Sequence, residues 1–255
     1  MRHSASKKTR HYVLLLAAAA LCGAGAGLHE QLRAQQAPVT AQVEIVKRGD
    51  LQPASATSSA KDAADVVVWL TPVDQKASAP GNSSKEPQLV QRNKAFEPHL
   101  LVVQAGTSVQ FPNKDPFFHN VFSLFNGKRF DLGLYEAGSS KSVRFDRVGV
   151  SFLFCNIHEE MSAVVVAVDT PYFAISDRSG HVSIPSVPEG RYESHVWYER
   201  SLPEDLKTLE RPVTISASAR SLDVLRVVNN PDFTLAHKNK YGQDYVPPPT
   251  TGYVK

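Results

Sequence analysis

Residues 150–168 read VSFLFCNIHEEMSAVVVAV, two apolar runs separated by a polar stretch that carries a thiol, an imidazole and a thioether. The runs, Val150 to Phe154 and Ala163 to Val168, have the length and the β-branched and aromatic content of buried strands. The stretch between them begins where a strand ends. Cys155, His158 and Met161 are therefore expected within seven residues of one loop.

The sequence on the N-terminal side of this loop continues as short strands and turns. No segment between residues 88 and 169 keeps a period of 3.6 residues, which excludes a helical bundle for this part of the chain. The region is predicted to be an all-β sandwich or barrel. The strands expected there include Leu100 to Val103, Val109 to Phe111, Val121 to Phe125 and Ser142 to Phe145.

A second β pattern follows, and two further strands precede residue 88. Residues 202–210 are expected to form one or two helical turns, residues 49–62 a loop, and residues 74–87 a linker of turn-forming residues. Residues 229–255, with three consecutive prolines, are predicted to be an extended C-terminal tail. The strands of this pattern are expected at 42–47, 66–70, 172–175, 181–184, 191–198, 213–215 and 222–228.

Length and composition limit the class of protein. The chain has 255 residues, 42% hydrophobic and 21% charged, which fits one large or two modest globular domains. Two cysteines are too few for a disulfide scaffold. The fold class that we expect is all-β throughout.

The first 34 residues have the pattern of a signal peptide: a basic start, an apolar run from Tyr12 to Leu21, and small residues before a cleavage site after Ala34. This predicts export, to the periplasm of a bacterium. An uncleaved segment that anchors the protein to the inner membrane is the alternative, and it is the only membrane contact expected. A lipoprotein site at Cys22 is disfavoured by Leu21.

Removal of residues 1–34 changes both the charge and the thiol content. The remaining chain holds 23 basic and 24 acidic side chains, so charge gives no reason to expect nucleic-acid binding. Cys155 is then the sole thiol. In an oxidising compartment it forms an intermolecular disulfide, lies buried and inert, or binds a metal.

The neighbours of Cys155 favour the metal. Upstream, Asn113 opens a loop that leads to His119 and Asn120, so that His119, Cys155, His158 and Met161 offer two imidazoles, a thiolate and a thioether. This donor set suits copper in both of its oxidation states, in a trigonal two-His, one-Cys site with a weak axial Met. Zinc is the rival metal, but it rarely uses Met. The absence of a second cysteine in the loop argues against a dinuclear copper centre.

Together these motifs resemble the cupredoxins, and the spacing of the Cys155 loop resembles that of the amicyanin-like members. The resemblance covers residues 88–169. It implies one copper ion held by His119, Cys155, His158 and Met161, with Asn120 tying the two ligand loops together. Its implied function is one-electron transport, not catalysis, with a redox partner protein such as a cytochrome or a periplasmic oxidoreductase. Ile157 departs from the pattern, because several relatives have proline there.

The second β pattern resembles the carboxypeptidase regulatory-like, transthyretin-like sandwich, through the turns at Asp177 to Gly180 and Pro188 to Gly190 and the strand that follows. This predicts a discontinuous domain, residues 42–72 and 170–228, with the cupredoxin-like region inserted in it. In the rival tandem layout, residues 42–72 join the cupredoxin-like sheet. Exported proteins called methylamine-utilisation proteins resemble this pairing. The alternative function is copper delivery, or a module that binds a partner or a carbohydrate.

Overall fold

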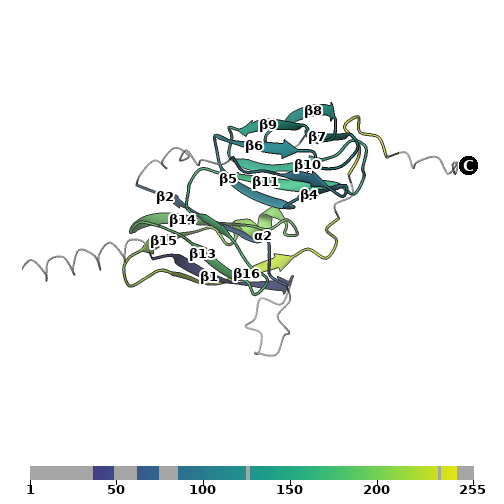
Figure 1. Cartoon of the computed structure of the whole chain (residues 1–255). Helices are drawn as coiled ribbons and strands as arrows, with labels where there is room; N and C mark the ends of the chain where they lie inside the picture. The colour runs from purple at the N-terminus through teal and green to yellow at the C-terminus, as the bar shows by residue number, and fades with distance from the viewer. Residues whose placement is uncertain (1–36, 49–61, 75–85, 125–126, 235–236, 246–255) are drawn as a thin grey trace, which may run out of the picture.

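The computed structural model describes residues 37–48, 62–74, 86–124, 127–234 and 237–245, and these residues form two stacked β-sandwiches (Figure 1). The expected all-β class is confirmed. The predicted signal peptide, residues 1–34, lies outside the described residues. Within the described ranges, no helix has the length and apolar content needed to cross a membrane.

The first sandwich holds the Cys155 loop. Its larger sheet has the strand order β5–β11–β10–β7–β8, and its smaller side is made of the hairpins β3–β4 and β6–β9, linked by bridges from Gln88 to Gln110 and from Gln91 to Asn113. The strands are β3 (Val90–Arg92), β4 (Ala95–Glu97), β5 (Leu100–Gln104), β6 (Thr107–Pro112), β7 (His119–Ser123), β8 (Phe130–Tyr135), β9 (Ser140–Phe145), β10 (Gly149–Phe154) and β11 (Ser162–Val168).

The second sandwich draws its strands from both sides of the first. One sheet has the order β13–β1–β16 and the other β12–β2–β14–β15. A short helix, α2 (Pro203–Lys207), lies between β14 and β15 in the chain. The strands are β1 (Val39–Lys47), β2 (Val67–Pro72), β12 (Phe173–Ile175), β13 (His181–Ile184), β14 (Gly190–Trp197), β15 (Arg211–Ile215) and β16 (Ser221–Asn229).

The chain leaves and re-enters the second sandwich at neighbouring strands. Strand β2 pairs antiparallel with β12, with Trp69 opposite Phe173, and with β14 on its other side. The Thr71 hydroxyl donates to the Asp169 carboxylate at 2.9 Å, next to the point where the chain returns. Residues 67–72 therefore lie in one sheet with residues 173–175 and 190–197.

An apolar layer joins the two sandwiches. The outer face of β5 and β11 presents Leu100, Val102, Val164 and Val166, which pack with Val67 and the aromatic side chains of the opposite sheet (Trp69, Phe173 and Trp197). Most of these positions alternate along their strands with positions that face the core of their own sandwich. The near-continuous apolar runs at residues 100–103 and 163–168 are explained by this burial on both faces.

Three strands, β3, β4 and β8, were not expected from the sequence. In β8 the run Phe130 to Tyr135 is interrupted by Gly133, which adopts a φ of +65°. Strands β3 and β4 are three residues each, joined at Asn93 and Lys94, which also have positive φ. Short strands with unusual turn conformations leave little alternating pattern to detect.

Candidate metal centre

The Cys155 loop closes a hairpin. Strands β10 and β11 are paired up to Phe154 and Ser162, and the seven residues between them form the loop. The backbone N–H of Cys155 donates to the carbonyl of Met161 at 3.1 Å, and the N–H of Met161 donates to the carbonyl of His158 at 3.2 Å. These bonds keep both ends of the loop inside the sandwich, where Cys155 and Met161 are fully buried in one core cluster.

The second ligand segment is the start of β7, in the same sheet as β10. Phe122 pairs with Phe154, so the strand places His119 beside the Cys155 loop. His119 is fully buried. Its upstream loop, residues 113–118, is shaped by Asn113, whose side chain accepts from the N–H of Asp115 at 3.0 Å and donates to the carbonyl of Phe117 at 2.8 Å.

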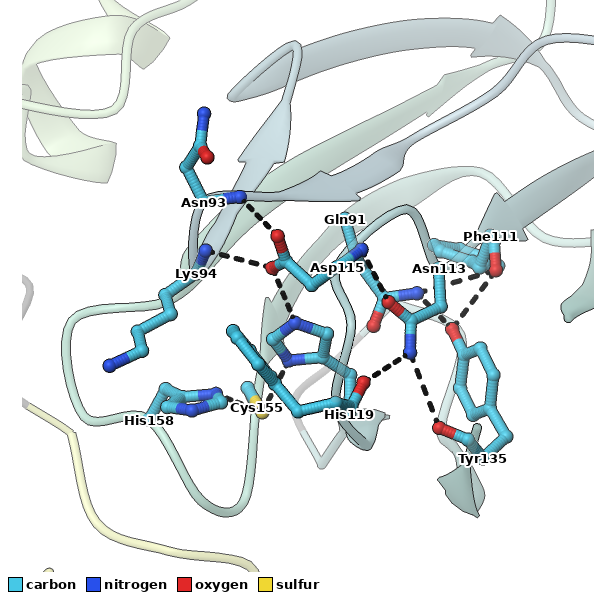
Figure 2. Close-up of polar contacts among 11 residues, drawn as sticks. Gln91, Asn93, Lys94, Phe111, Asn113, Asp115, His119, Tyr135, Cys155 and His158 are labelled. Carbon is cyan, nitrogen blue, oxygen red and sulfur yellow. Dashed lines mark hydrogen bonds and ion pairs between the residues drawn. The ribbon is translucent and has the colours of Figure 1, made fainter. Parts of the chain in front are cut away.

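His119, Cys155 and His158 meet at one point, with ligand atoms within 4.8 Å of one another (Figure 2). The Cys155 Sγ lies 3.8 Å from His119 Nδ1 and 3.5 Å from His158 Nδ1. The two imidazole rings are 4.8 Å apart at 60°. Three of the predicted ligands are thus brought together. Because Cys155 is buried, its sulfur is not accessible to a second molecule for an intermolecular disulfide.

A buried carboxylate sets the orientation of His119. The Nε2–H of His119 donates to Asp115 Oδ2 at 2.7 Å, which leaves Nδ1 free to face Cys155 (Figure 2). The backbone N–H groups of Asn93 and Lys94 donate to the same carboxylate at 2.7 and 3.0 Å. Burial opposes ionisation, but the bonds from Lys94, His119 and Asn93 outweigh it and lower the pKa of Asp115.

Asp115 was missed in the sequence, although a signal was present. It is four residues before His119 in the loop that the motif identifies, close enough for a carboxylate to reach back to the ring. Its partners in the β3–β4 turn belong to a hairpin that the sequence does not predict. The bond from His119 to Asp115 could be proposed from spacing, but the bonds that fix Asp115 could not.

Cys155 and His158 have a different environment from that of His119. Burial raises the pKa of the Cys155 thiol, against bonds from the N–H groups of Asn120, Ile157 and His158 that lower it. For His158, burial and the neighbouring charges of His119 and Lys94 lower the pKa. Without a bound cation the thiol stays neutral, so a metal ion would have to displace its proton.

Asn120 makes contacts through its side chain and its backbone. Its side-chain amide donates to Asp131 Oδ1 in β8 at 2.7 Å. Its backbone N–H bonds the Cys155 sulfur. Met161, the fourth predicted ligand, is buried on the same loop.

His158 lies at the edge of the site. It is only partly buried, and the Phe117 ring packs against both imidazoles, 5.2 Å from His119 and 5.7 Å from His158. Ile157, beside it in the loop, is 45% exposed. Of the three clustered groups, His158 is the one nearest to solvent, and charged side chains also lie beside it: Lys94 and the exposed Glu159.

Comparisons with known proteins concern part of the chain. No family model matches, and no curated protein matches the sequence. A purple cupredoxin from Nitrosopumilus maritimus is similar to 32% of this chain over 99% of its own, at 24% identity and a TM-score of 0.30. A reduced amicyanin variant is similar to 39% of this chain over 98% of its own, at 19% identity and a TM-score of 0.31. A copper-containing nitrite reductase from Thermus scotoductus is matched over 25% of its length, at 21% identity, 38% of this chain and a TM-score of 0.32.

Proposed function

We propose that this chain is a mononuclear type 1 copper protein that carries single electrons. One observation carries the proposal: two imidazoles turn the same nitrogen, Nδ1, toward one buried sulfur. The Nδ1 of His119 carries no proton, because the Nε2–H of the same ring donates to Asp115, so its lone pair faces the sulfur. A cation among the three atoms satisfies both nitrogens and the sulfur at once.

The distances fit such an ion. With metal–sulfur bonds of about 2.3 Å and metal–nitrogen bonds of about 2.0–2.1 Å, angles between tetrahedral and trigonal separate sulfur from nitrogen by about 3.5–3.8 Å. The two separations at Cys155 are 3.5 and 3.8 Å. The donor set, two imidazoles and a thiolate with Met161 nearby in the loop, is the one that copper prefers, whereas zinc rarely uses a thioether.

Each residue has a distinct part in this function. Bound copper supplies one-electron chemistry by cycling between Cu(I) and Cu(II). Cys155 gives up its proton and provides the thiolate, and Asp115 holds His119 in one orientation. Met161 would hold the ion more weakly than the other three ligands. His158 is proposed as the exit for the electron, because it alone of the three clustered ligands approaches the surface.

The remaining parts of the proposal concern location and partners. The N-terminal segment is proposed to export the protein to the periplasm, and a redox protein, such as a cytochrome or a periplasmic oxidoreductase, is proposed to dock on the surface around His158. The second sandwich is proposed to be of the transthyretin-like, carboxypeptidase regulatory-like type. The support is the turn pattern of residues 172–197 and the antiparallel pairing of β2 with β12 and β14.

The decisive experiment is the absorption spectrum of the copper-loaded protein with Cys155 present and replaced. The wild type should show an intense visible thiolate-to-copper band that bleaches on reduction, and Cys155→Ser should abolish it. Circular dichroism of the variant controls for folding. A copper-loaded wild type without the band would refute the proposal, and transfer of the metal to an acceptor without fast electron exchange would favour delivery.

Met161→Gln separates the axial ligand from the other three. If the thioether binds weakly, the variant keeps its copper and changes mainly the reduction potential, because axial ligands tune that potential. Voltammetry of wild type and variant measures the difference. Complete loss of metal affinity in the variant would show that the weak axial assignment is wrong.

A further inference from the structure

The C-terminal residues cross from one sandwich to the other. Strand β16 ends at Asn229 in the second sandwich, and the chain then runs to the first, where residues 237–245 lie against β10 and its loop (Figure 1). The His237 ring stacks on Phe154 with 3.9 Å between centroids and 30° between planes. Phe154 is the residue immediately before Cys155. We call residues 237–245 the strap.

The strap bonds two consecutive residues of the ligand loop. The Tyr245 hydroxyl donates to the backbone carbonyl of Cys155 at 2.7 Å, and the backbone N–H of Lys240 donates to Asn156 Oδ1 at 2.9 Å. A tyrosine hydroxyl is protonated at neutral pH, so Tyr245 remains a donor to this carbonyl.

The strap also reaches the other ligand segment. The ammonium of Lys240 contacts Asp131 Oδ2 at 2.7 Å, and Asp131 Oδ1 accepts from the Asn120 amide at 2.7 Å. Asn120 is the residue after His119. A single strap residue, Lys240, thus connects the Cys155 loop with the strand that carries His119. This is a side-chain tie between the two ligand segments, a role that the Asn120 side chain does not fill alone.

We propose that the strap is part of the metal centre, and that Tyr245 and Lys240 are positioning residues that hold the Cys155 loop against the His119 strand. The inference rests on the proposed function for its effect on copper. The claim that the strap restrains the Cys155 loop does not depend on copper. By limiting the movement of the Cys155 backbone, the strap keeps the sulfur at a fixed distance from both imidazoles, whichever the oxidation state of the metal.

The test compares Tyr245→Phe with Tyr192→Phe in the full chain. Both remove one hydroxyl that donates to a backbone carbonyl, but Tyr192 donates to Pro188 at 2.9 Å in the second sandwich, so it is the matched control. In metal-free protein, Tyr245→Phe should speed amide hydrogen exchange in residues 155–161 by about fivefold, the size expected for one neutral hydrogen bond. Tyr192→Phe should leave that exchange unchanged.

The copper-loaded proteins give the second readout. Loss of an outer hydrogen bond that orients a ligand lowers metal affinity by about tenfold or more, so Tyr245→Phe should weaken copper in competition with a chelator and shift the visible band. Unchanged loop exchange and unchanged copper affinity in Tyr245→Phe would overturn the inference. Equal effects of Tyr192→Phe and Tyr245→Phe on the loop would overturn it too, because the loop would then respond to any lost hydroxyl and not to the strap.

Lys240→Met provides an independent variant. It keeps the apolar stem and the backbone N–H but removes the ammonium that contacts Asp131. Exchange should rise at Asn120 and its neighbours in β7 while the rest of the sheet is unaffected. Wild-type protein without a thiolate band but with these exchange differences would refute the copper function and leave the strap intact, so the two failures are distinguishable.

Discussion

The two sandwiches bury different kinds of side chain. In the second, the core cluster is made of aliphatic residues with Tyr192 at its edge, and its buried polar groups are hydroxyls such as Ser176 and Ser194. In the first, the core also encloses an acid, an imidazole and several amides: Asp115, His119, Gln91, Asn113 and Asn120.

The first sandwich therefore has polar side chains at buried positions that apolar side chains occupy in the second. Burying a polar group costs free energy unless it is hydrogen-bonded. The groups of the first sandwich are bonded largely to one another and to nearby backbone, in a chain that leads from Asn113 through Asp115 to His119. The second sandwich has no comparable network among its described residues and is best understood as the supporting body.

The largest difference is expected from a matched pair of core substitutions, Leu70→Ala in the second sandwich and Leu153→Ala in the first. Both leucines are fully buried, so each variant should lose about 2–5 kcal/mol of unfolding free energy. Only Leu153→Ala should also shift the visible band of the copper-loaded protein, because Leu153 packs in the cluster of Cys155 and Met161. Chemical denaturation and absorption measure both. A shifted band in Leu70→Ala would show that the second sandwich is not a mere support.

Asp115→Asn should have the next largest effect. The amide keeps one oxygen acceptor but removes the charge that the His119 N–H faces, so copper affinity should fall about 10- to 100-fold. Competition with a chelator gives the value. Asp146→Asn is the control, because Asp146 is an exposed carboxylate that pairs with Lys128 and not with a ligand residue. If Asp115→Asn and the wild type bind copper with equal affinity, the Asp115 carboxylate does not contribute to metal binding.

The smallest effect concerns the junction of the two sandwiches. His99, before β5, contacts Glu199, after β14, at 2.8 Å, and it also contacts the Ser162 carbonyl at 3.2 Å. The bond to Glu199 raises the pKa of His99 above its ordinary 6.5. The pair therefore adds stability below pH 6.5 and loses it as the pH rises through the higher folded-state pKa.

The variant His99→Gln removes this pH dependence. Because the His99 side chain is 40% exposed, the contribution is at most about 1 kcal/mol. The difference in unfolding free energy between wild type and variant should be present at pH 5.5 and shrink by pH 8.5. A difference that grows as the pH rises would reverse the assigned sign.

The sequence allowed the general plan to be predicted, together with the residues that approach one another at the site. Alternation and turn signals identify most strands, and the Cys155 spacing identifies the loop. The contacts that hold the ligands in place were harder to predict, because Asp115 is bound by a β3–β4 turn that has no recognisable sequence pattern. The sequence predicted the strap only as part of an extended tail, since nothing in residues 237–245 indicates which sandwich they contact.

The adjacency of β2 and β12 has a mechanical consequence. Two of the chain connections between the sandwiches leave β2 and enter β12, one strand spacing apart, about 4.8 Å. A third is the passage from β16 to the strap, and an apolar layer packs between the two sandwiches. A domain on a single linker would sample many orientations. Here three chain connections and the apolar layer join the sandwiches, so a protein that binds the second sandwich is expected to meet the His158 imidazole at a nearly constant angle and distance.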